Sequence, residues 1–239
     1  MPSVESHTLD RDIGHHRQVQ ARQVHEVYKA LLKQHGTQTW WPADGRFEIM
    51  AGAILTQNTA WTNVAKAIEN LKAADMLHAD AIHQAKQESL ASLIRPSGYY
   101  NLKARRLKNY CAWYTEAGRY QKLRYWSTDR LRTALLSVHG VGPETADDIL
   151  LYAFGRPVFV IDAYTRRIFA RLGVIHGNEA YDAIRAIFER HLPRRAGVFA
   201  EYHALIVQHG KEVCRPAPRC GHCDLAAMCR FHQNLHQPE

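Results

Sequence analysis

Four cysteines gather near the end of the chain at the spacing C-x5-C-x2-C-x5-C: Cys214, Cys220, Cys223 and Cys229. Four thiolates in one short loop can enclose either a tetrahedral zinc ion or a cubane iron–sulfur cluster. The disulfides of a secreted domain are usually spread along the chain instead. The spacing therefore predicts a metal centre and leaves the metal open. Cys111 lies in a helical pattern and is predicted to be a buried apolar side chain.

Asp162 is a second residue that could do chemistry, because it stands between the short apolar segment 158–161 and a predicted helix over 163–172. Position alone favours a structural N-cap, in which the carboxylate accepts backbone N–H bonds. The same bonds and the helix dipole lower the pKa of a carboxylate and keep it ionised at neutral pH. An ionised carboxylate can stabilise the cationic, oxocarbenium-like state of glycosidic bond cleavage. Catalysis is thus the second interpretation of Asp162.

A pair of glycines, Gly140 and Gly142, separates an apolar helix end from a helix that begins at Pro143. This arrangement predicts two helices joined by a very tight turn, with His139 at its start and backbone N–H groups pointing outward. Such N–H groups can bind a DNA phosphate without reading a base. Ordinary helix punctuation is the other interpretation of the same spacing.

These residues must be positioned by helices, because apolar residues recur at helical spacing almost throughout the chain. Only the segment 158–161 looks extended, and it is too short to found a sheet. Glycine- and proline-containing turns divide the helical stretches. The sequence predicts an all-α protein of about nine or ten helices.

The 239 residues are 46% hydrophobic, which allows a sizeable core in one large domain or two small lobes. The net charge of +8 favours an anionic partner, and no long apolar segment points to a bilayer. The leading interpretation of this charge is that the chain binds nucleic acid. The alternative is that the chain is an ordinary basic soluble protein. Residues 1–20 form a polar leader without the apolar stretch of a secretory signal, so we expect a cytoplasmic protein.

Most of the chain, from about Trp40 to Cys229, resembles the helix-hairpin-helix DNA glycosylase superfamily, which includes endonuclease III. Several motifs in the family's order carry the resemblance, namely the segments 54–59, 98–104, 138–146, 149–157 and 160–167 and the C-terminal cysteines. It implies that Asp162 is the catalytic carboxylate and that the cysteines hold a [4Fe-4S] cluster. The gap between the first two cysteines is one residue shorter here than is usual in the family.

The resemblance also implies two helical lobes with a DNA cleft between them. We expect residues 40–135 to form a helical barrel lobe. Residues 21–39 and 136–239 would form a second lobe, which includes the hairpin (135–146) and the cluster loop (214–229), and the leader 1–20 would be flexible. The expected partner is double-stranded DNA with a damaged base, bound by a monomer that associates with the nucleoid through its DNA and not with a membrane.

Glu144 stands where endonuclease III has a nucleophilic lysine on the second helix of the hairpin. A carboxylic side chain cannot form the imine that strand cleavage requires, so water is the expected nucleophile. The sequence leaves two roles open for Glu144, a part in the catalytic pocket or a favourable charge in the first helical turn. With this residue and the segments 40–42, 56–61 and 160–167, the chain looks most like the 3-methyladenine DNA glycosylases built on the endonuclease III plan. Those are monofunctional enzymes that release alkylated purines.

An alkylated purine is cationic and a good leaving group, so stacking against aromatic walls suits its recognition. Trp40, Trp41 and Trp61 are candidates for these walls, and core packing is the alternative for each.

By resemblance, Gln57 would fill the gap left by the extruded base and Tyr99 would be the apolar wedge. Both could instead be ordinary interhelical residues. A basic group on both sides of Tyr99 in the sequence could contact phosphates or form a solvated helix face: Arg95, Lys103, Arg105, Arg106 and Lys108.

Other activities remain as alternatives. The first is an endonuclease III-like bifunctional glycosylase and lyase for oxidised pyrimidines, which Glu144 disfavours. The second is a mismatch adenine or uracil glycosylase. The third comes from another class, a DNA-binding module that keeps the fold without catalysis and binds DNA in a salt-sensitive way.

Overall fold

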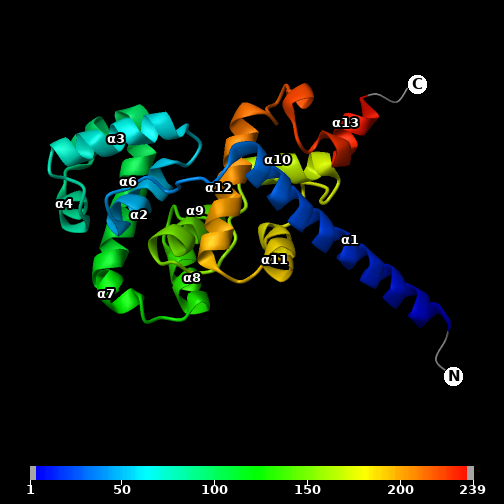
Figure 1. Ribbon diagram of the computed structural model, residues 1–239. Helices are drawn as coiled ribbons and strands as arrows, with labels where there is room; N and C mark the ends of the chain where they lie inside the picture. Colours follow the sequence, from blue (N-terminus) through cyan, green and yellow to red (C-terminus); the bar gives the residue numbers. More distant parts are fainter. Residues whose placement is uncertain (1–3, 236–239) are drawn as a thin grey trace. The chain divides into compact units, whose positions relative to one another are not determined.

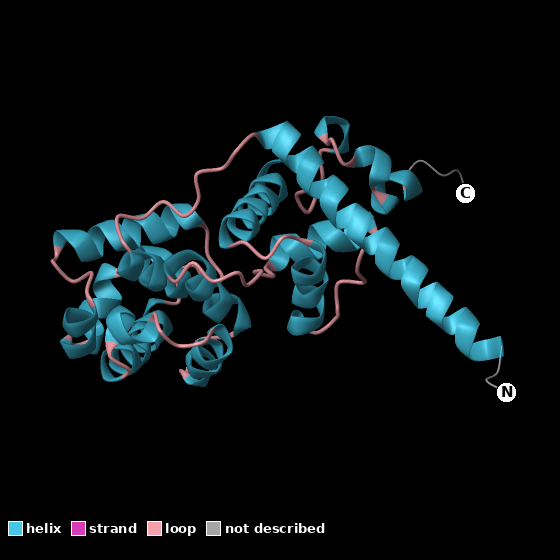
Figure 2. Ribbon diagram, turned by 60° about the horizontal axis from the view of Figure 1, so that its bottom comes forward, coloured by secondary structure: helices cyan, strands magenta, loops and turns pink. Residues whose placement is uncertain are grey.

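Helices make up the regular structure of the chain in the computed structural model, which describes the backbone of residues 4–235 and the side chains of residues 20–235. Figure 2 shows helices joined by loops, and the described residues contain no strand. This confirms the all-α prediction. The described part has thirteen α-helices rather than nine or ten, because short helices such as α4, α7 and α13 form between the longer ones. None of these helices is long and apolar enough to cross a bilayer.

The chain divides into two compact units, unit 1 (residues 1–40 and 159–239) and unit 2 (residues 41–158). Figure 1 labels the main helices of both. Unit 2 contains α2 (Arg46–Leu55), α3 (Trp61–Ala73), α4 (Ala79–Gln84), α5 (Gln87–Leu93), the 3-10 turn η1 (Arg95–Ser97), α6 (Tyr100–Glu116), α7 (Arg119–Leu123), α8 (Thr128–Ser137), α9 (Pro143–Asp148) and the π-helical turn η2 (Ile149–Ala153). Unit 1 contains α1 (Val4–His35), α10 (Ala163–Leu172), α11 (Tyr181–His191), α12 (Ala196–Glu212), the 3-10 turns η3 (Cys220–His222) and η4 (Ala226–Met228), and α13 (Arg230–Asn234).

The boundary after unit 2 differs from the one expected from the sequence. The hairpin was expected in the second lobe, which would begin at residue 136, but the structure places it in unit 2, which ends at Val158. The reason is packing: Ala146, Ile149 and Leu150 are fully buried in the same core as Met50 and Ile54 of α2. The hairpin therefore belongs to the hydrophobic core that the barrel helices build.

The core of unit 2 surrounds α6, which packs against α2, α4 and α5. Leu107 and Tyr110 of this helix are fully buried. The core of unit 1 is aromatic: the Phe159 and Phe188 rings stack with centroids 4.2 Å apart, and Tyr202 meets the Phe159 ring edge-on. Offset and edge-on contacts of this kind stabilise a core beyond simple area burial.

Helix α1 begins at Val4, so its backbone includes most of the segment that was predicted as a polar leader, and the predicted flexibility of that leader stays a prediction. From Val24 onward α1 contributes to the core of unit 1, where Val24, Val27 and Leu31 are buried. The backbone carbonyl of Val24 accepts a 2.8 Å hydrogen bond from the Tyr202 hydroxyl of α12. The end of α1 is thus fixed by the aromatic core of unit 1.

Candidate active site

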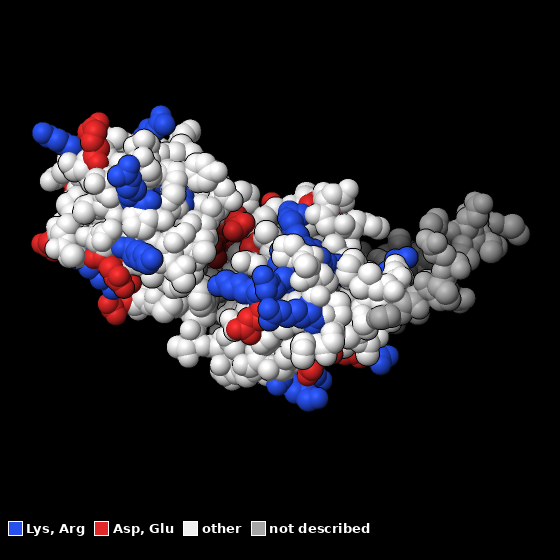
Figure 3. Space-filling view, turned by 90° about the horizontal axis from the view of Figure 1, so that it is seen from above, with Lys and Arg blue, Asp and Glu red and all other residues white. Residues whose placement is uncertain are grey.

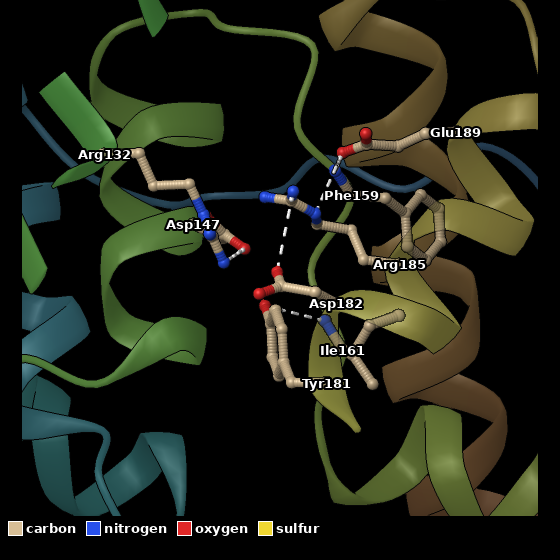
Figure 4. Close-up of polar contacts among 8 residues, drawn as sticks. All are labelled: Arg132, Asp147, Phe159, Ile161, Tyr181, Asp182, Arg185 and Glu189. Carbon is tan, nitrogen blue, oxygen red and sulfur yellow. Dashed lines mark hydrogen bonds and ion pairs between the residues drawn. The ribbon is translucent and has the colours of Figure 1, made fainter. Parts of the chain in front are cut away.

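Asp162 is positioned by an extended segment that α11 holds in place. The Phe159 N–H donates to the Glu189 carboxylate at 3.0 Å, and the Ile161 N–H donates to the Tyr181 hydroxyl at 3.2 Å (Figure 4). The apolar residues at 158–161 look like a strand in the sequence, but they have no strand partner and bond to side chains instead. These bonds set the point at which α10 begins and so fix the backbone of Asp162.

Asp162 is the N-cap of α10. Its Oδ1 atom accepts hydrogen bonds from the Thr165 N–H at 2.7 Å and from the Thr165 hydroxyl at 2.8 Å. The predicted cap is therefore present, with the carboxylate at the positive end of an amphipathic helix. Its Oδ2 atom lies 3.7 Å from Nε2 of His203 in α12.

The surroundings of Asp162 keep its carboxylate ionised. Only 11% of the side chain is exposed, and this burial alone would raise its pKa. The nearby His203 ring and the two bonds from Thr165 outweigh burial, so the pKa of Asp162 lies below its ordinary value. Asp162 is thus a nearly buried anion at neutral pH, the form needed to stabilise a developing positive charge.

His203 was missed by sequence reasoning. It lies in the middle of α12 among buried apolar residues, and it is itself 5% exposed. A histidine in an apolar helical stretch is a weak signal, because such a residue is often only packed in a core. His203 lies close to Asp162 because α10 and α12 pack against each other.

Trp40 and Lys211 lie together in unit 1. The Lys211 ammonium is 5.3 Å from the centre of the Trp40 ring, a cation–π distance. Burial lowers the pKa of Lys211, and the negative charge of Asp162 opposes that shift. Trp40 is half-buried, so it carries a cation on its ring rather than lying in the apolar core.

The predicted tight turn of the hairpin is present between α8 and α9. Gly140 adopts φ +99°, and a Cβ atom there would clash with the Arg106 side chain, so both the backbone and the packing favour glycine. Gly142 is the N-cap of α9, and Pro143 occupies its first turn. His139, Gly142 and Glu144 are exposed. The first turn of α9 therefore presents its backbone and the Glu144 carboxylate at the surface of unit 2.

Gln57 is bonded to this hairpin. Its Nε2 atom donates to the Gly140 carbonyl at 3.0 Å and to the Thr145 hydroxyl at 2.9 Å. Its Oε1 atom accepts a hydrogen bond from the Arg106 guanidinium. Sequence reasoning placed Gln57 and the glycines in separate motifs, and the fold of unit 2 brings them into one network.

Tyr99 stands apart from that network. It has φ +46°, and 65% of its surface is exposed, which is unusual for a large aromatic side chain. Trp41 and Trp61 contact each other edge-on with ring centres 5.1 Å apart, and Trp41 also contacts Tyr152 at 5.3 Å. Trp41 and Trp61 thus form one aromatic group in unit 2, whereas Trp40 belongs to unit 1.

Two residues of the predicted basic group are not on a solvated face, and that prediction is wrong for them. Lys103 is 1% exposed. Lys108 is half-buried and donates to the Ala85 carbonyl. Both side chains turn inward because helix α6 is covered on several sides by α2, α4 and α5. Arg105 remains exposed.

The four C-terminal cysteines line a single pocket with Arg171, Pro218 and Phe231. The Arg171 guanidinium donates to Cys214 Sγ at 3.3 Å, and His209 Nε2 lies 3.5 Å from Cys223 Sγ. Burial, together with the other three thiols, raises the pKa of Cys223 to about 11. Bound metal would favour the thiolate form of Cys223, because a thiol that coordinates a metal loses its proton.

The described residues contain no three Cys, His, Asp or Glu side chains grouped to hold a single metal ion. Cys111 is fully buried in α6, and burial raises its pKa to about 12. It behaves as the apolar side chain that the sequence predicted.

A basic pocket of about 530 Å³ lies where the end of α12 meets the cluster loop in unit 1. Lys211, Arg215 and Arg219 line it together with His35 and His222, and Glu212 is its one acidic lining residue. On the face that Figure 3 shows, several Lys and Arg side chains lie close together, with Asp and Glu side chains beside them. The charges of this pocket suit an anion such as a phosphate.

Comparison with known proteins places these features in a family context. Residues 51–194 match the family model described as HhH-GPD superfamily base excision DNA repair protein. The chain is 49% identical to a protein of Methanocaldococcus jannaschii that is provisionally named a DNA repair glycosylase. That similarity covers 86% of this chain and 95% of the relative. This chain is also 27% identical to endonuclease III of Sulfolobus acidocaldarius, over 78% of this chain and 82% of that relative.

Two solved structures are similar in fold. The 3-methyladenine DNA glycosylase MagIII of H. pylori, bound to 1,N6-ethenoadenine, has a TM-score of 0.67 and 30% identity over 82% of this chain and 97% of its own. An endonuclease III–DNA complex has a TM-score of 0.78 and 22% identity over 90% of this chain and 97% of its own. The second likeness shows the fold alone.

Proposed function

Because the chain belongs to the HhH-GPD superfamily of base excision DNA repair proteins, we propose that it is a monofunctional DNA N-glycosylase that releases alkylated purines of the 3-methyladenine type from duplex DNA. The environment of the Asp162 carboxylate is the observation that supports this proposal most directly. Asp162 is a nearly buried carboxylate that caps α10 and has its pKa held below the ordinary value.

The proposed chemistry is hydrolysis of the N-glycosidic bond. As the bond between C1′ and the base nitrogen breaks, its electron pair leaves with the purine and positive charge grows on the sugar. The ionised Asp162 stabilises that charge, and a water molecule adds to C1′ and loses a proton. An alkylated purine already carries positive charge, so it leaves as a neutral base and needs little acid catalysis.

The alkylpurine preference is supported by likeness and by aromatic residues. The H. pylori relative that is 30% identical is a 3-methyladenine glycosylase bound to a modified adenine. In this chain, the edge-on pair Trp41 and Trp61 in unit 2 and Trp40 in unit 1 offer aromatic surface for a flat cationic base.

The lack of lyase activity is proposed from Glu144. Strand cleavage by the imine route needs an amine that condenses with the C1′ aldehyde, and Glu144 occupies the first turn of α9 with a carboxylic side chain. An exposed acid at this helix end complements the helix dipole and requires no further role.

Duplex DNA is the proposed partner. The exposed turn at Gly142 offers backbone N–H groups to a phosphate, and the basic pocket around Arg215 and Arg219 suits another. Gln57 and Tyr99 are the proposed gap-filling and wedge residues. The 65% exposure of Tyr99 leaves its ring available for insertion between bases.

The four C-terminal cysteines are proposed to hold a [4Fe-4S] cluster. The donor set fits, since all four thiols line one pocket beside the basic loop. When bound, the cluster would supply the cationic centre that these thiolates need and would fix the loop. Iron content and the visible absorption spectrum of purified protein test this. Cys220→Ser is expected to lower the iron content, and zinc in place of iron would contradict the proposal.

The decisive experiment measures base release from duplexes that carry 3-methyladenine or 7-methylguanine, with strand breaks scored before and after alkali. Wild type should release the base and give breaks only after alkali, whereas Asp162→Asn should release it far more slowly. Breaks without alkali would point to a bifunctional enzyme. No release would lead to oxidised pyrimidines and mismatches as substrates, and DNA binding without release from any of them would indicate a non-catalytic member of the fold.

A further inference from the structure

Lys103 is a fully buried charged residue that the glycosylase chemistry does not use. It lies in the first turns of α6, and 1% of its surface is exposed. Its ammonium donates hydrogen bonds to two backbone carbonyls, Ser97 O at 2.6 Å and Leu55 O at 2.9 Å. Burying a lysine is costly unless its charge is satisfied, so these two bonds are needed to hold it there.

The two carbonyls belong to segments far apart in the sequence. Leu55 is the last residue of α2, two positions before Gln57. Ser97 ends the 3-10 turn η1, two positions before Tyr99. One ammonium therefore links the loop that carries the proposed gap-filling residue with the loop that carries the proposed wedge.

Both loops contain strained backbone beyond the attachment point. Asn58 has φ +54° and Tyr99 has φ +46°, a conformation in which non-glycine residues are uncommon. Such conformations persist only where surrounding contacts over-determine them. Lys103 supplies such a contact to each loop. Arg106, one turn further along α6, adds a hydrogen bond to the Gln57 side chain.

We propose that Lys103 is a positioning residue that fixes the Gln57 and Tyr99 loops to each other, so that both side chains enter an opened duplex in register. The inference rests on the proposed function, because it assumes that these two residues act in extrusion of the base. Burial and the nearby Arg106 lower the pKa of Lys103 to about 8, so the residue is mostly an ammonium at neutral pH and can donate to both carbonyls.

The chain offers a matched control in Lys108. It lies on the same helix, is partly buried and also donates to a backbone carbonyl, that of Ala85. Ala85 is the C-cap of α4, and no proposed DNA-contacting residue lies next to it. Lys103→Met and Lys108→Met therefore remove the same chemical group from α6, but only the first disconnects the two loops.

The test compares binding to a duplex with a tetrahydrofuran abasic analogue and to the same duplex without it. A merely structural defect would change the active fraction of a preparation. That fraction affects both Kd values equally, so their ratio does not depend on it. Wild type should prefer the abasic duplex. Lys103→Met should reduce the preference by about tenfold and Lys108→Met should leave it within about twofold. In the Lys103→Met background, the further substitution Tyr99→Ala should reduce the preference for the abasic duplex only slightly more.

A full preference in Lys103→Met overturns the inference while leaving the proposed function intact. So does an equal loss in both lysine variants. If Lys103→Met does not fold, Lys103→Gln replaces it: its shorter side chain cannot reach both carbonyls, and a full preference there also overturns the inference. The inference is also overturned if the wild-type protein binds both duplexes equally. Base release by that protein would still support the proposed function.

Discussion

Asp162 in unit 1 and Asp147 in unit 2 are both carboxylates withdrawn from solvent, and their surroundings differ. Asp147 has no exposed side-chain surface, and its two oxygens accept from the Arg132 guanidinium at 2.7 and 3.2 Å (Figure 4). Asp162 keeps 11% of its side chain exposed and is held by Thr165 and the His203 ring. One carboxylate is neutralised by a permanent cation, and the other keeps most of its negative charge.

The comparison teaches that burial does not identify a catalytic carboxylate. A bidentate arginine pair satisfies both oxygens of Asp147 and makes it a structural link between α8 and α9. The hydrogen bonds from Thr165 stabilise the charge of Asp162 without cancelling it. Only a carboxylate of the second kind can stabilise a cation that forms beside it.

The largest expected effect is on catalysis. Asp162→Asn should lower the rate of alkylpurine release by about 10²- to 10³-fold, because the stabilising charge is lost. Asparagine is an equally good N-cap, so stability should fall only by the contribution of the lost negative charge. Single-turnover base release and thermal unfolding check both points. Asp147→Asn is the control, and a comparable loss of rate per folded molecule in that variant would break the comparison.

The next effect is on stability. Arg132→Met removes the guanidinium from a buried carboxylate and should lower the free energy of unfolding by about 3–5 kcal/mol. Base release per folded molecule should stay close to that of wild type. Urea unfolding followed by circular dichroism measures the first quantity. An unchanged unfolding midpoint would show that the Arg132–Asp147 pair is not the structural link described above.

A third effect concerns pH. Because the pKa of Asp162 lies below its ordinary value, the carboxylate stabilises the fold above the unfolded-state pKa, and this contribution is lost as pH falls through the lower folded-state pKa. Base release should fall over the same low-pH range. His203→Gln should raise the pKa of Asp162 and move the acidic limb of the rate profile to higher pH. An acidic limb at the wild-type position would rule out the proposed role of His203.

The smallest effect is expected at a third carboxylate, the exposed Glu144. Glu144→Gln removes the negative charge that complements the first turn of α9, so base release should fall no more than about fivefold. The same single-turnover assay measures it. A loss as large as that of Asp162→Asn would assign Glu144 to the catalytic pocket, the other role that the sequence leaves open.

Much of the fold could be predicted from the sequence because its signals are local. Apolar spacing gave the helices, Gly140 and Gly142 gave the tight turn, and the position of Asp162 before an amphipathic helix gave the cap. The boundary of unit 2 could not be placed, because it depends on which core Ala146 and Ile149 join. Burial of Lys103 was also missed, since a lysine on a helix is exposed unless neighbouring segments cover it.

The sequence by itself determined the helical class, the hairpin turn, the cap at Asp162 and the four cysteines of one loop. These follow from residue types within a few positions of one another. Only the tertiary structure decided that His203 lies beside Asp162 and that Gln57 is bonded to the hairpin. It also decided that one buried lysine links the Gln57 and Tyr99 loops. The physical reason is that long-range contacts depend on how helices pack, and packing combines residues that no local pattern relates.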